Sequence, residues 1–228
     1  EYMSSEFDAR KTAMIAVVAM SGIFLTAAAN AVPTLRLTQG ASSVTVSDNG
    51  GGDINAVSGV VTFSGAIGDF VVNTTTGITK PILGSATVPI LDLNSINVNG
   101  NNAGTIVLEF SETDFTNTSA TLDMISVIGG TTAGTLQFET FGSFINTLFA
   151  TDIMIADSGA LTGGILFDEI TTAALTGTFS LTTRVTITHT GDFDNSSFNS
   201  VLEVPEPSVM APFILGTMLI GANLLVRR

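Results

Sequence analysis

The stretch Arg184-Val185-Thr186-Ile187-Thr188-His189 alternates polar and apolar side chains from one residue to the next. Successive side chains of a β-strand point to opposite faces of a sheet, so Val185, Ile187 and His189 would share one face while Arg184 and the threonines share the other. This alternation predicts a half-buried strand, with His189 at the end of an apolar stripe.

Similar short runs recur along the chain, and two of them, Thr34-Leu35-Arg36-Leu37-Thr38 and Ser43-Val44-Thr45-Val46-Ser47, alternate as cleanly. Further strands are predicted at Val60–Phe63, Phe70–Val72, Val88–Leu93, Thr105–Phe110, Thr121–Ile128, Thr135–Phe141, Thr151–Ile155 and Thr178–Leu181. Asn99-Gly100 is a candidate hairpin turn. No run between Val32 and Pro207 keeps helical spacing over three turns. About ten strands with little helix predict an all-β fold, an antiparallel β-sandwich or jelly-roll-like domain.

Composition agrees with a sheet protein and limits its chemistry. The chain has 33 threonines and 23 glycines, but neither cysteine nor tryptophan. β-Branched residues suit a pleated, half-buried surface, and glycines suit its turns. Without cysteine, thiol catalysis, disulfides and thiolate metal sites are excluded.

Charge excludes one class of partner. Between Val32 and Pro207 there are 17 Asp and Glu residues against Arg36, Lys80 and Arg184, a net charge of −14. Nothing in this span could neutralise a phosphate backbone, so nucleic acid is not an expected partner.

The N-terminal segment is typical of a secretory signal peptide. Arg10-Lys11 precede an apolar run from Thr12 to Thr26, which ends in Ala27-Ala28-Ala29-Asn30-Ala31. The small residues Ala29 and Ala31 predict cleavage by signal peptidase after Ala31. Because the sequence begins at Glu1, we expect either a true start at Met3 or a fragment of a longer chain.

The C-terminal segment has three parts: Val204-Pro205-Glu206-Pro207-Ser208, an uncharged stretch from Val209 to Val226, and Arg227-Arg228. Eighteen residues of helix are roughly 27 Å long, close to the thickness of the hydrocarbon core of a bilayer. A transmembrane helix is therefore predicted, and the arginine pair would stay cytoplasmic.

This ending resembles the PEP-CTERM sorting signal of exported Gram-negative bacterial proteins. The resemblance implies an exosortase-type processing enzyme as partner, a transient anchor in the inner membrane, and release to the cell surface or extracellular matrix. An ordinary tail anchor is the alternative. The whole chain is therefore predicted to have three parts: a signal peptide with upstream residues (1–31), a single β-sandwich domain (32–203) and the sorting signal (204–228).

The second half is also similar to a group of small exported PEP-CTERM proteins, on residues from Ser111-Glu112-Thr113-Asp114 through Val185–Gly191 to Ser196-Ser197-Phe198. That resemblance implies one all-β domain and a context of exopolysaccharide and biofilm matrix. It implies no catalytic residues.

A short internal similarity relates Ala103-Gly104-Thr105-Ile106 to Ala133-Gly134-Thr135-Leu136. Each segment leads into a strand with an acidic residue, Glu109 or Glu139. Two matches do not make a repeat array, so we interpret them as a recurrent hairpin pattern.

Few residues offer catalytic chemistry. His189 is the single histidine, and without a Gly-x-Ser-x-Gly motif we expect it to make a local hydrogen bond. Glycoside hydrolysis needs two carboxylates and usually aromatic platforms, which a chain without tryptophan offers poorly. The carboxylate pairs available are Asp168-Glu169, Glu112 with Asp114, and Asp192 with Asp194. No catalytic residues and no enzyme activity are therefore predicted.

Calcium is the best-supported ligand, because it prefers hard oxygen donors. Two acidic loops could supply them, Asp48, Asn49 and Asp53 in one, and Asp192 and Asp194 with Asn195 in the other. Acidic turn residues facing water are the simpler interpretation of both loops.

Three functions remain open. The first is an exported structural or adhesive protein of the cell surface or matrix, without a cofactor and with exopolysaccharide as an expected partner. The second is a β-sandwich module that binds calcium or glycan, and the third is a hydrolase.

Overall fold

The structure, a computed structural model, describes residues 31–205 of the 228. The predicted signal-peptide helix and the predicted C-terminal transmembrane helix lie outside the described residues. Within residues 31–205, no helix has the length and apolar character needed to cross a membrane.

Ten strands make up the described domain. In chain order they are β1 (Thr34–Gln39), β2 (Ser42–Ser47), β3 (Val60–Ile67), β4 (Phe70–Ile78), β5 (Ile90–Gly100), β6 (Gly104–Asn117), β7 (Leu122–Ser143), β8 (Ile153–Ala173), β9 (Gly177–His189) and β10 (Asn195–Glu203). All pairings are antiparallel, in the order β2-β1-β6-β9-β7-β10-β5-β4-β3, and β8 pairs with β7. The all-β, antiparallel prediction is confirmed.

Strand β7 joins two layers of this sheet. Its first part pairs with β10 as far as Thr132, and its second part pairs with β9 from Thr135 onward. At Gly134, between the two parts, a Cβ atom would lie 2.0 Å from the carbonyl oxygen of Thr188. Only glycine allows the backbone of β7 to pass this close to β9 as it changes partner.

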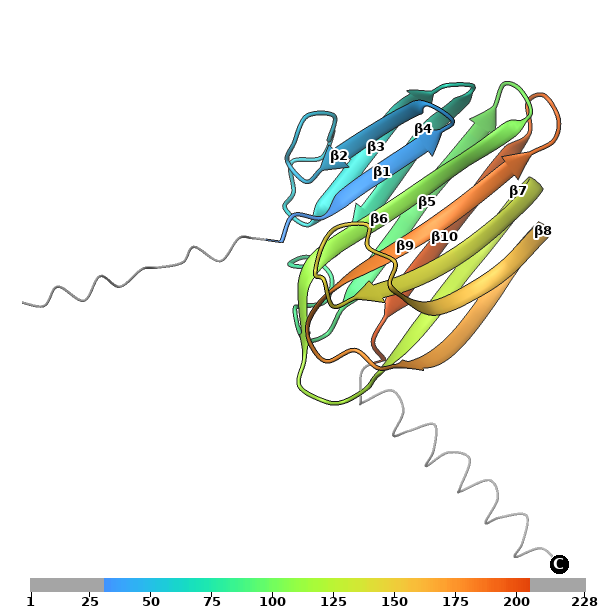
Figure 1. Cartoon of the computed structure of the whole chain (residues 1–228). Helices are drawn as coiled ribbons and strands as arrows, with labels where there is room; N and C mark the ends of the chain where they lie inside the picture. The colour runs from blue at the N-terminus through green and yellow to red at the C-terminus, as the bar shows by residue number, and fades with distance from the viewer. Residues whose placement is uncertain (1–30, 206–228) are drawn as a thin grey trace, which may run out of the picture. The chain divides into compact units, whose positions relative to one another are not determined.

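The two layers face each other across one apolar core, with β1, β6 and β9 in one layer and β3, β4, β5 and β10 in the other (Figure 1). Phe110 of β6 packs so closely on β4 that a Cβ atom at Gly77 would come within 2.5 Å of its ring. The rings of Phe70 on β4 and His189 on β9 also meet, 5.4 Å apart. The arrangement is sandwich-like.

The alternation in Arg184–His189 is confirmed. Val185 and Ile187 are fully buried and His189 is 1% exposed, whereas Thr186 and Thr188 on the other face are partly exposed. Burying each such aliphatic side chain contributes about 1.5–3 kcal/mol. A fold without disulfides depends on this core.

Strand boundaries differ from the prediction in several places. The runs Thr178–Leu181 and Arg184–His189 are one strand, β9. The runs Thr121–Ile128 and Thr135–Phe141 are one strand, β7, and Thr151–Ile155 is only the start of the 21-residue β8. Strand β10 was not predicted, because its serines and asparagines are poor strand formers.

The predicted hairpin at Asn99-Gly100 is wrong. Both residues belong to β5, where Asn99 pairs with Asn195 and Gly100 with Phe70. Strand β5 therefore pairs with β10 and β4, and the chain crosses to β6 in the other layer after Gly100.

Candidate functional site

A row of four charged side chains crosses the outer face of the layer that contains β9. Arg36 on β1 lies opposite Glu109 on β6, and Arg184 on β9 lies opposite both Glu109 and Glu139, the latter on β7. We call these four residues the charged row. Because the strands are in register, basic and acidic side chains alternate along it.

Glu109 accepts hydrogen bonds from both arginines of the charged row. The Arg36 Nε donates to Glu109 Oε2 at 2.6 Å, and the Arg184 Nε donates to Glu109 Oε1 at 3.0 Å. Arg184 Nη1 is 3.9 Å from Glu139 Oε2. Both oxygens of the nearly buried Glu109 are therefore committed to arginines.

Aromatic rings hold both guanidinium groups in place. The Arg36 guanidinium carbon lies 4.0 Å from the centre of the Phe149 ring, and that of Arg184 lies 4.9 Å from the Phe141 ring. Burial raises the pKa of Glu139, the charge of Arg184 lowers it, and the carboxylates of Asp157 and Glu109 raise it further.

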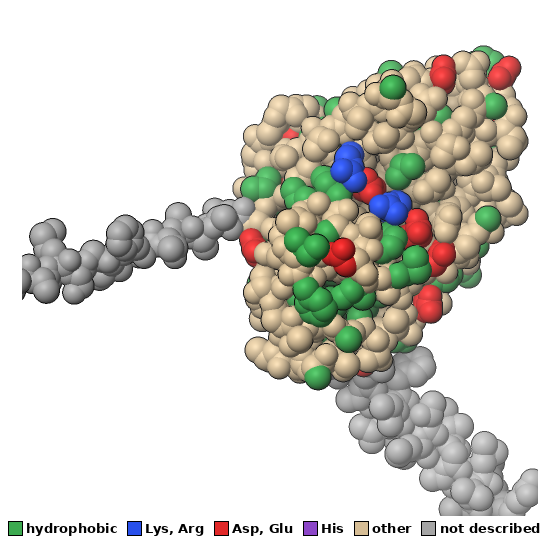
Figure 2. All heavy atoms as spheres, viewed as in Figure 1, with side chains coloured by type: hydrophobic (Ala, Val, Ile, Leu, Met, Phe, Trp, Pro, Cys, Tyr) green, Lys and Arg blue, Asp and Glu red, His purple; other side chains and the backbone are tan. Residues whose placement is uncertain are grey.

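The charged row lines an open groove of about 580 Å³. Figure 2 shows basic and acidic groups side by side on this face of the domain. The other lining residues are mostly hydroxyl-bearing: Thr38, Ser43, Val107 and Thr186. Guanidinium, carboxylate and hydroxyl groups therefore line the groove.

The internal similarity in the sequence has its explanation here. Thr105 and Thr135 both lie opposite Thr188, and Glu109 and Glu139 both lie opposite Arg184. The two similar segments flank β9 on its two sides in the same register. They resemble each other because they occupy equivalent environments, and the interpretation as a hairpin pattern missed this.

The carboxylates proposed as pairs lie elsewhere. Asp168 and Glu169 are exposed on β8. Glu112 is fully buried on β6, where it accepts a hydrogen bond from Thr79 Oγ1 at 2.5 Å and lies 3.1 Å from Lys80 Nζ. Burial raises the pKa of Glu112 and lowers that of Lys80, against the attraction between them.

Asp114 and Asp194 hold the backbone or a neighbouring loop. Asp114 Oδ1 accepts a hydrogen bond from Asn146 Nδ2 at 2.6 Å, and the backbone N–H of Asp114 donates to Asn146 Oδ1. Asp194 Oδ2 accepts from the N–H groups of Thr190 and Gly191, at 3.1 and 2.9 Å. These two carboxylates therefore shape turns.

The first calcium loop is organised in the same way. Asp53 Oδ1 accepts from the N–H groups of Asn55 and Thr62, and its Oδ2 accepts from that of Asn49. Asp48 Oδ2 accepts from the N–H of Gly59 at 2.9 Å. Among residues 31–205, no three acidic or histidine side chains are grouped as metal ligands. Calcium binding by Asp48, Asn49 and Asp53, or by Asp192 and Asp194, stays a prediction.

His189 makes the local hydrogen bond expected of it. Its Nε2 is 2.8 Å from Ser196 Oγ on β10, and burial lowers its pKa while Asp194 raises it. Its Nδ1 has no hydrogen-bond partner among the described residues. The ring packs on Phe70 inside the core, away from the groove.

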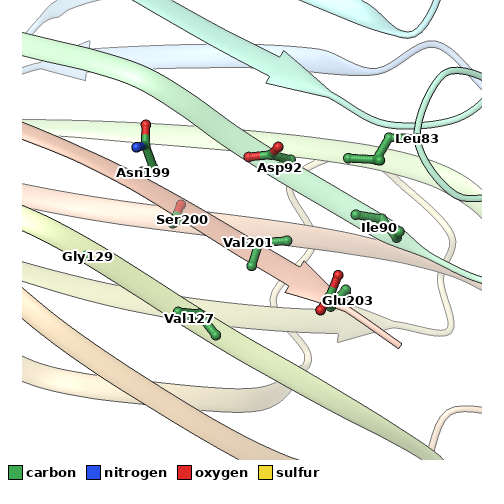
Figure 3. A pocket seen from close by; sticks show the side chains of 9 residues that line it. All are labelled: Leu83, Ile90, Asp92, Val127, Gly129, Asn199, Ser200, Val201 and Glu203. Carbon is green, nitrogen blue, oxygen red and sulfur yellow. The ribbon is translucent and has the colours of Figure 1, made fainter. Parts of the chain in front are cut away.

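A second groove, of about 530 Å³, lies over the opposite layer, between β5, β10 and β7 (Figure 3). It is lined by Leu83, Ile90, Asp92, Val127, Gly129, Asn199, Ser200, Val201 and Glu203. Burial raises the pKa of Asp92, although a hydrogen bond from Asn94 lowers it. No pattern in the sequence indicated this groove, because its residues come from strands that are distant in the chain.

The predicted processing residues are only partly described. Ala31 precedes β1, and Val204 follows β10, where its N–H donates to the carbonyl oxygen of Pro89 at 3.1 Å. Pro205 follows and is partly exposed. Ala29, Glu206, Pro207, Ser208, Arg227 and Arg228 lie outside the described residues.

Comparisons with known proteins add little. No protein-family model and no curated protein matches the sequence. Among solved structures, the isomaltodextranase of Arthrobacter globiformis T6 in complex with panose is similar at 10% identity and a TM-score of 0.25. The match covers 63% of this chain and 23% of that one. A likeness this distant carries no argument about fold or function.

Proposed function

We propose that the protein is an exported structural or adhesive component of the cell surface or extracellular matrix. In this proposal a β-sandwich domain is delivered by a signal peptide and released by processing at a C-terminal sorting signal. The observation that carries it is the three-part ending: Val204–Ser208, the apolar stretch from Val209 to Val226, and Arg227-Arg228.

The described domain is compatible with this role. Its last strand ends at Glu203, immediately before Val204-Pro205. The processing junction therefore follows the folded domain directly, and cleavage there would leave all ten strands intact. The core is held without disulfides, so the domain would fold in either a reducing or an oxidising compartment.

Three titratable groups are poorly placed for acid–base catalysis. His189 is buried and hydrogen-bonded to Ser196, which removes it from solvent. Glu112 is buried beside Lys80, and Glu109 is held by two arginines. A general acid or base must reach a substrate proton, and these groups are occupied.

Localisation and mass spectrometry test the proposal. The protein isolated from the surface or matrix should begin at or near Val32 and should lack Arg227-Arg228. Deletion of its gene should weaken the matrix. Cytoplasmic protein that retains peptides joining residues 21–31 to Val32 would contradict export.

A second candidate function is glycan binding, which the hydroxyl-lined groove around the charged row favours. Ser43 is exposed at this groove. Replacing Ser43 by Trp should fill the groove and abolish retention on purified exopolysaccharide. Thr118→Trp, at an exposed position away from the groove, is the control. Equal retention of both variants would exclude the groove as the binding site.

A further inference from the structure

Strand β8 is a long free edge of the sheet. Among the described residues it pairs with β7 alone, and its other side faces no strand. It has 21 residues, whereas β2 and β3, at the other two edges, have 6 and 8. An unpaired edge presents backbone N–H and C=O groups to any strand that can align with it.

Two common protections of an edge strand, short length and lysine or proline residues, are missing from β8. Natural sheets block their edges with lysine, proline or short strands, but β8 contains no lysine, arginine or proline. Gly159 and Gly163 have positive φ and interrupt the strand near its middle. From Gly163 to Ala173 the register with β7 is continuous, which leaves eleven residues of regular edge.

Apolar side chains lie along this regular part. Leu166 is 79% exposed and Ile170 is 58% exposed, and both are on the outer face of the layer. Leu166 lies opposite Gly129 of β7, which has no side chain to cover it. Val127, on the same face of β7, borders the second groove (Figure 3) and lies opposite Asp168 of β8.

We infer that this edge pairs with the same edge of a second copy of the chain, antiparallel and about a two-fold axis at Phe167. Antiparallel addition of a strand satisfies the free backbone groups of both copies at once. The proposal concerns assembly and holds whether or not the chain is a matrix protein.

This register keeps like charges apart. Leu166 of one copy faces Asp168 of the other, Ile165 faces Glu169, and Gly164 leaves room for Ile170. No two carboxylates oppose each other. Moving the axis to Asp168 would place the two copies of that residue together, and like charges directly opposite each other are destabilising.

Charge distinguishes a second copy from a basic partner. The described domain is acidic, and its three cations, Arg36, Lys80 and Arg184, are all in ion pairs. Two copies therefore repel each other at long range, and salt that screens this repulsion should strengthen their association. A basic partner would bind more weakly as salt rises.

Analytical ultracentrifugation of the chain, purified as the cells process it, tests the inference. We expect a monomer–dimer equilibrium that shifts toward dimer as salt rises. Leu166→Asp should give a folded monomer, because this side chain is 79% exposed and the new carboxylate would directly oppose Asp168 of the other copy. Ile145→Asp, at an apolar position 66% exposed on the loop after β7, adds the same charge away from the edge and should leave the dimer intact.

Cysteine pairing tests the register, since the chain has no cysteine of its own. The double variant Leu166→Cys, Asp168→Cys should form covalent dimers on mild oxidation, because each new thiol faces the other type in the partner copy. The same double change at Ser43 and Thr45 on the short edge β2 should not. A monomer at every concentration and salt, a dimer unaffected by Leu166→Asp, or association that weakens as salt rises would overturn the proposal.

Discussion

Arg184 is the residue on which the charged row depends, because it alone contacts both glutamates. Replacing it by Gln removes the positive charge between Glu109 and Glu139 and leaves two acidic side chains without their shared partner. Since Glu109 is 5% exposed, the loss should be substantial, about 2 kcal/mol in the free energy of unfolding after allowance for the partial exposure of Arg184.

Urea denaturation checks this prediction. Thr186→Val, on the same face of β9 two residues away, is the matched control and should change the free energy of unfolding by less than about 0.5 kcal/mol. Equal effects of the two substitutions would mean that the charged row contributes nothing specific. Because Arg36 still neutralises Glu109 in the Arg184→Gln variant, the domain should remain folded.

His189 should make stability depend on pH. Burial lowers its pKa in the folded state, so the unfolded chain takes up a proton more readily than the folded one. The contribution is fully present above the ordinary histidine pKa of about 6.5 and is lost as pH falls below it. We expect this group to decrease the free energy of unfolding between pH 7 and pH 5, whereas the raised pKa values of Asp92, Glu112 and Glu139 act in the opposite direction.

The variant His189→Gln isolates the histidine contribution, because glutamine can keep a hydrogen bond to Ser196 but does not titrate. The difference in stability between wild type and variant should shrink as pH falls through about 6.5. A difference that stays constant from pH 7.5 to 5.5 would show that the folded and unfolded states bind this proton equally.

At the scale of single elements, the bend in β7 sets the layered arrangement. Gly134→Ala would place a Cβ atom 2.0 Å from the carbonyl oxygen of Thr188, so β7 and β9 would have to separate. We expect a loss of about 2 kcal/mol or more in the free energy of unfolding. The melting temperature of the variant measures it.

Gly129→Ala, on β7 itself, is the matched control, because a Cβ atom there meets only the Ile165 carbonyl oxygen, at an ordinary 3.9 Å. The control should be neutral or slightly stabilising, since alanine reduces the freedom of the unfolded chain. If both alanine variants have the same melting temperature, the close approach at Gly134 does not determine the path of β7.

Alternation predicted the strands whose inner face is apolar, and for that reason β1 and β2 were found from sequence. Strand β9 was predicted as two runs, because the buried Thr183 interrupts its apolar face. Alternation did not identify the strands that bury polar residues or that form mainly by pairing with a neighbouring strand. Strand β10 buries Ser196 and Ser200 beside Phe198, so its inner face is not uniformly apolar. In β8, glycines and an exposed outer face break the pattern, and pairing with β7 forms the strand nonetheless.

The charged row could be predicted only in part. The similarity between the segments that lead to Glu109 and Glu139 was visible, but which strand lies between them is a property of topology. Arg184 is 45 residues beyond Glu139 in the chain, and no local pattern connects them. The burial of Glu112 beside Lys80 was hidden for the same reason, since Lys80 lies in the connection between β4 and β5.

At the scale of the whole molecule, the C-terminal segment is either a sorting signal that is removed by processing or a permanent membrane anchor. In the proposed function, an extended Pro-Glu-Pro segment directly after the folded domain is what the transpeptidase recognises, while the apolar stretch and Arg227-Arg228 hold it at the membrane. Changing Glu206 to Gln and Pro207 to Ala should therefore trap a longer, membrane-bound precursor. Recognition is lost, but the insertion energy of residues 209–226 is unchanged.

Membrane fractionation and intact mass distinguish the two outcomes. A change of Glu203 to Gln, just inside the last strand, is the control and should leave processing normal. If the wild-type protein on the surface still carries Arg227-Arg228, or if the altered junction is released as before, the ending is a simple tail anchor. Because the edge of β8 lies within the described domain, its self-association would persist in that case, and the two proposals can fail separately.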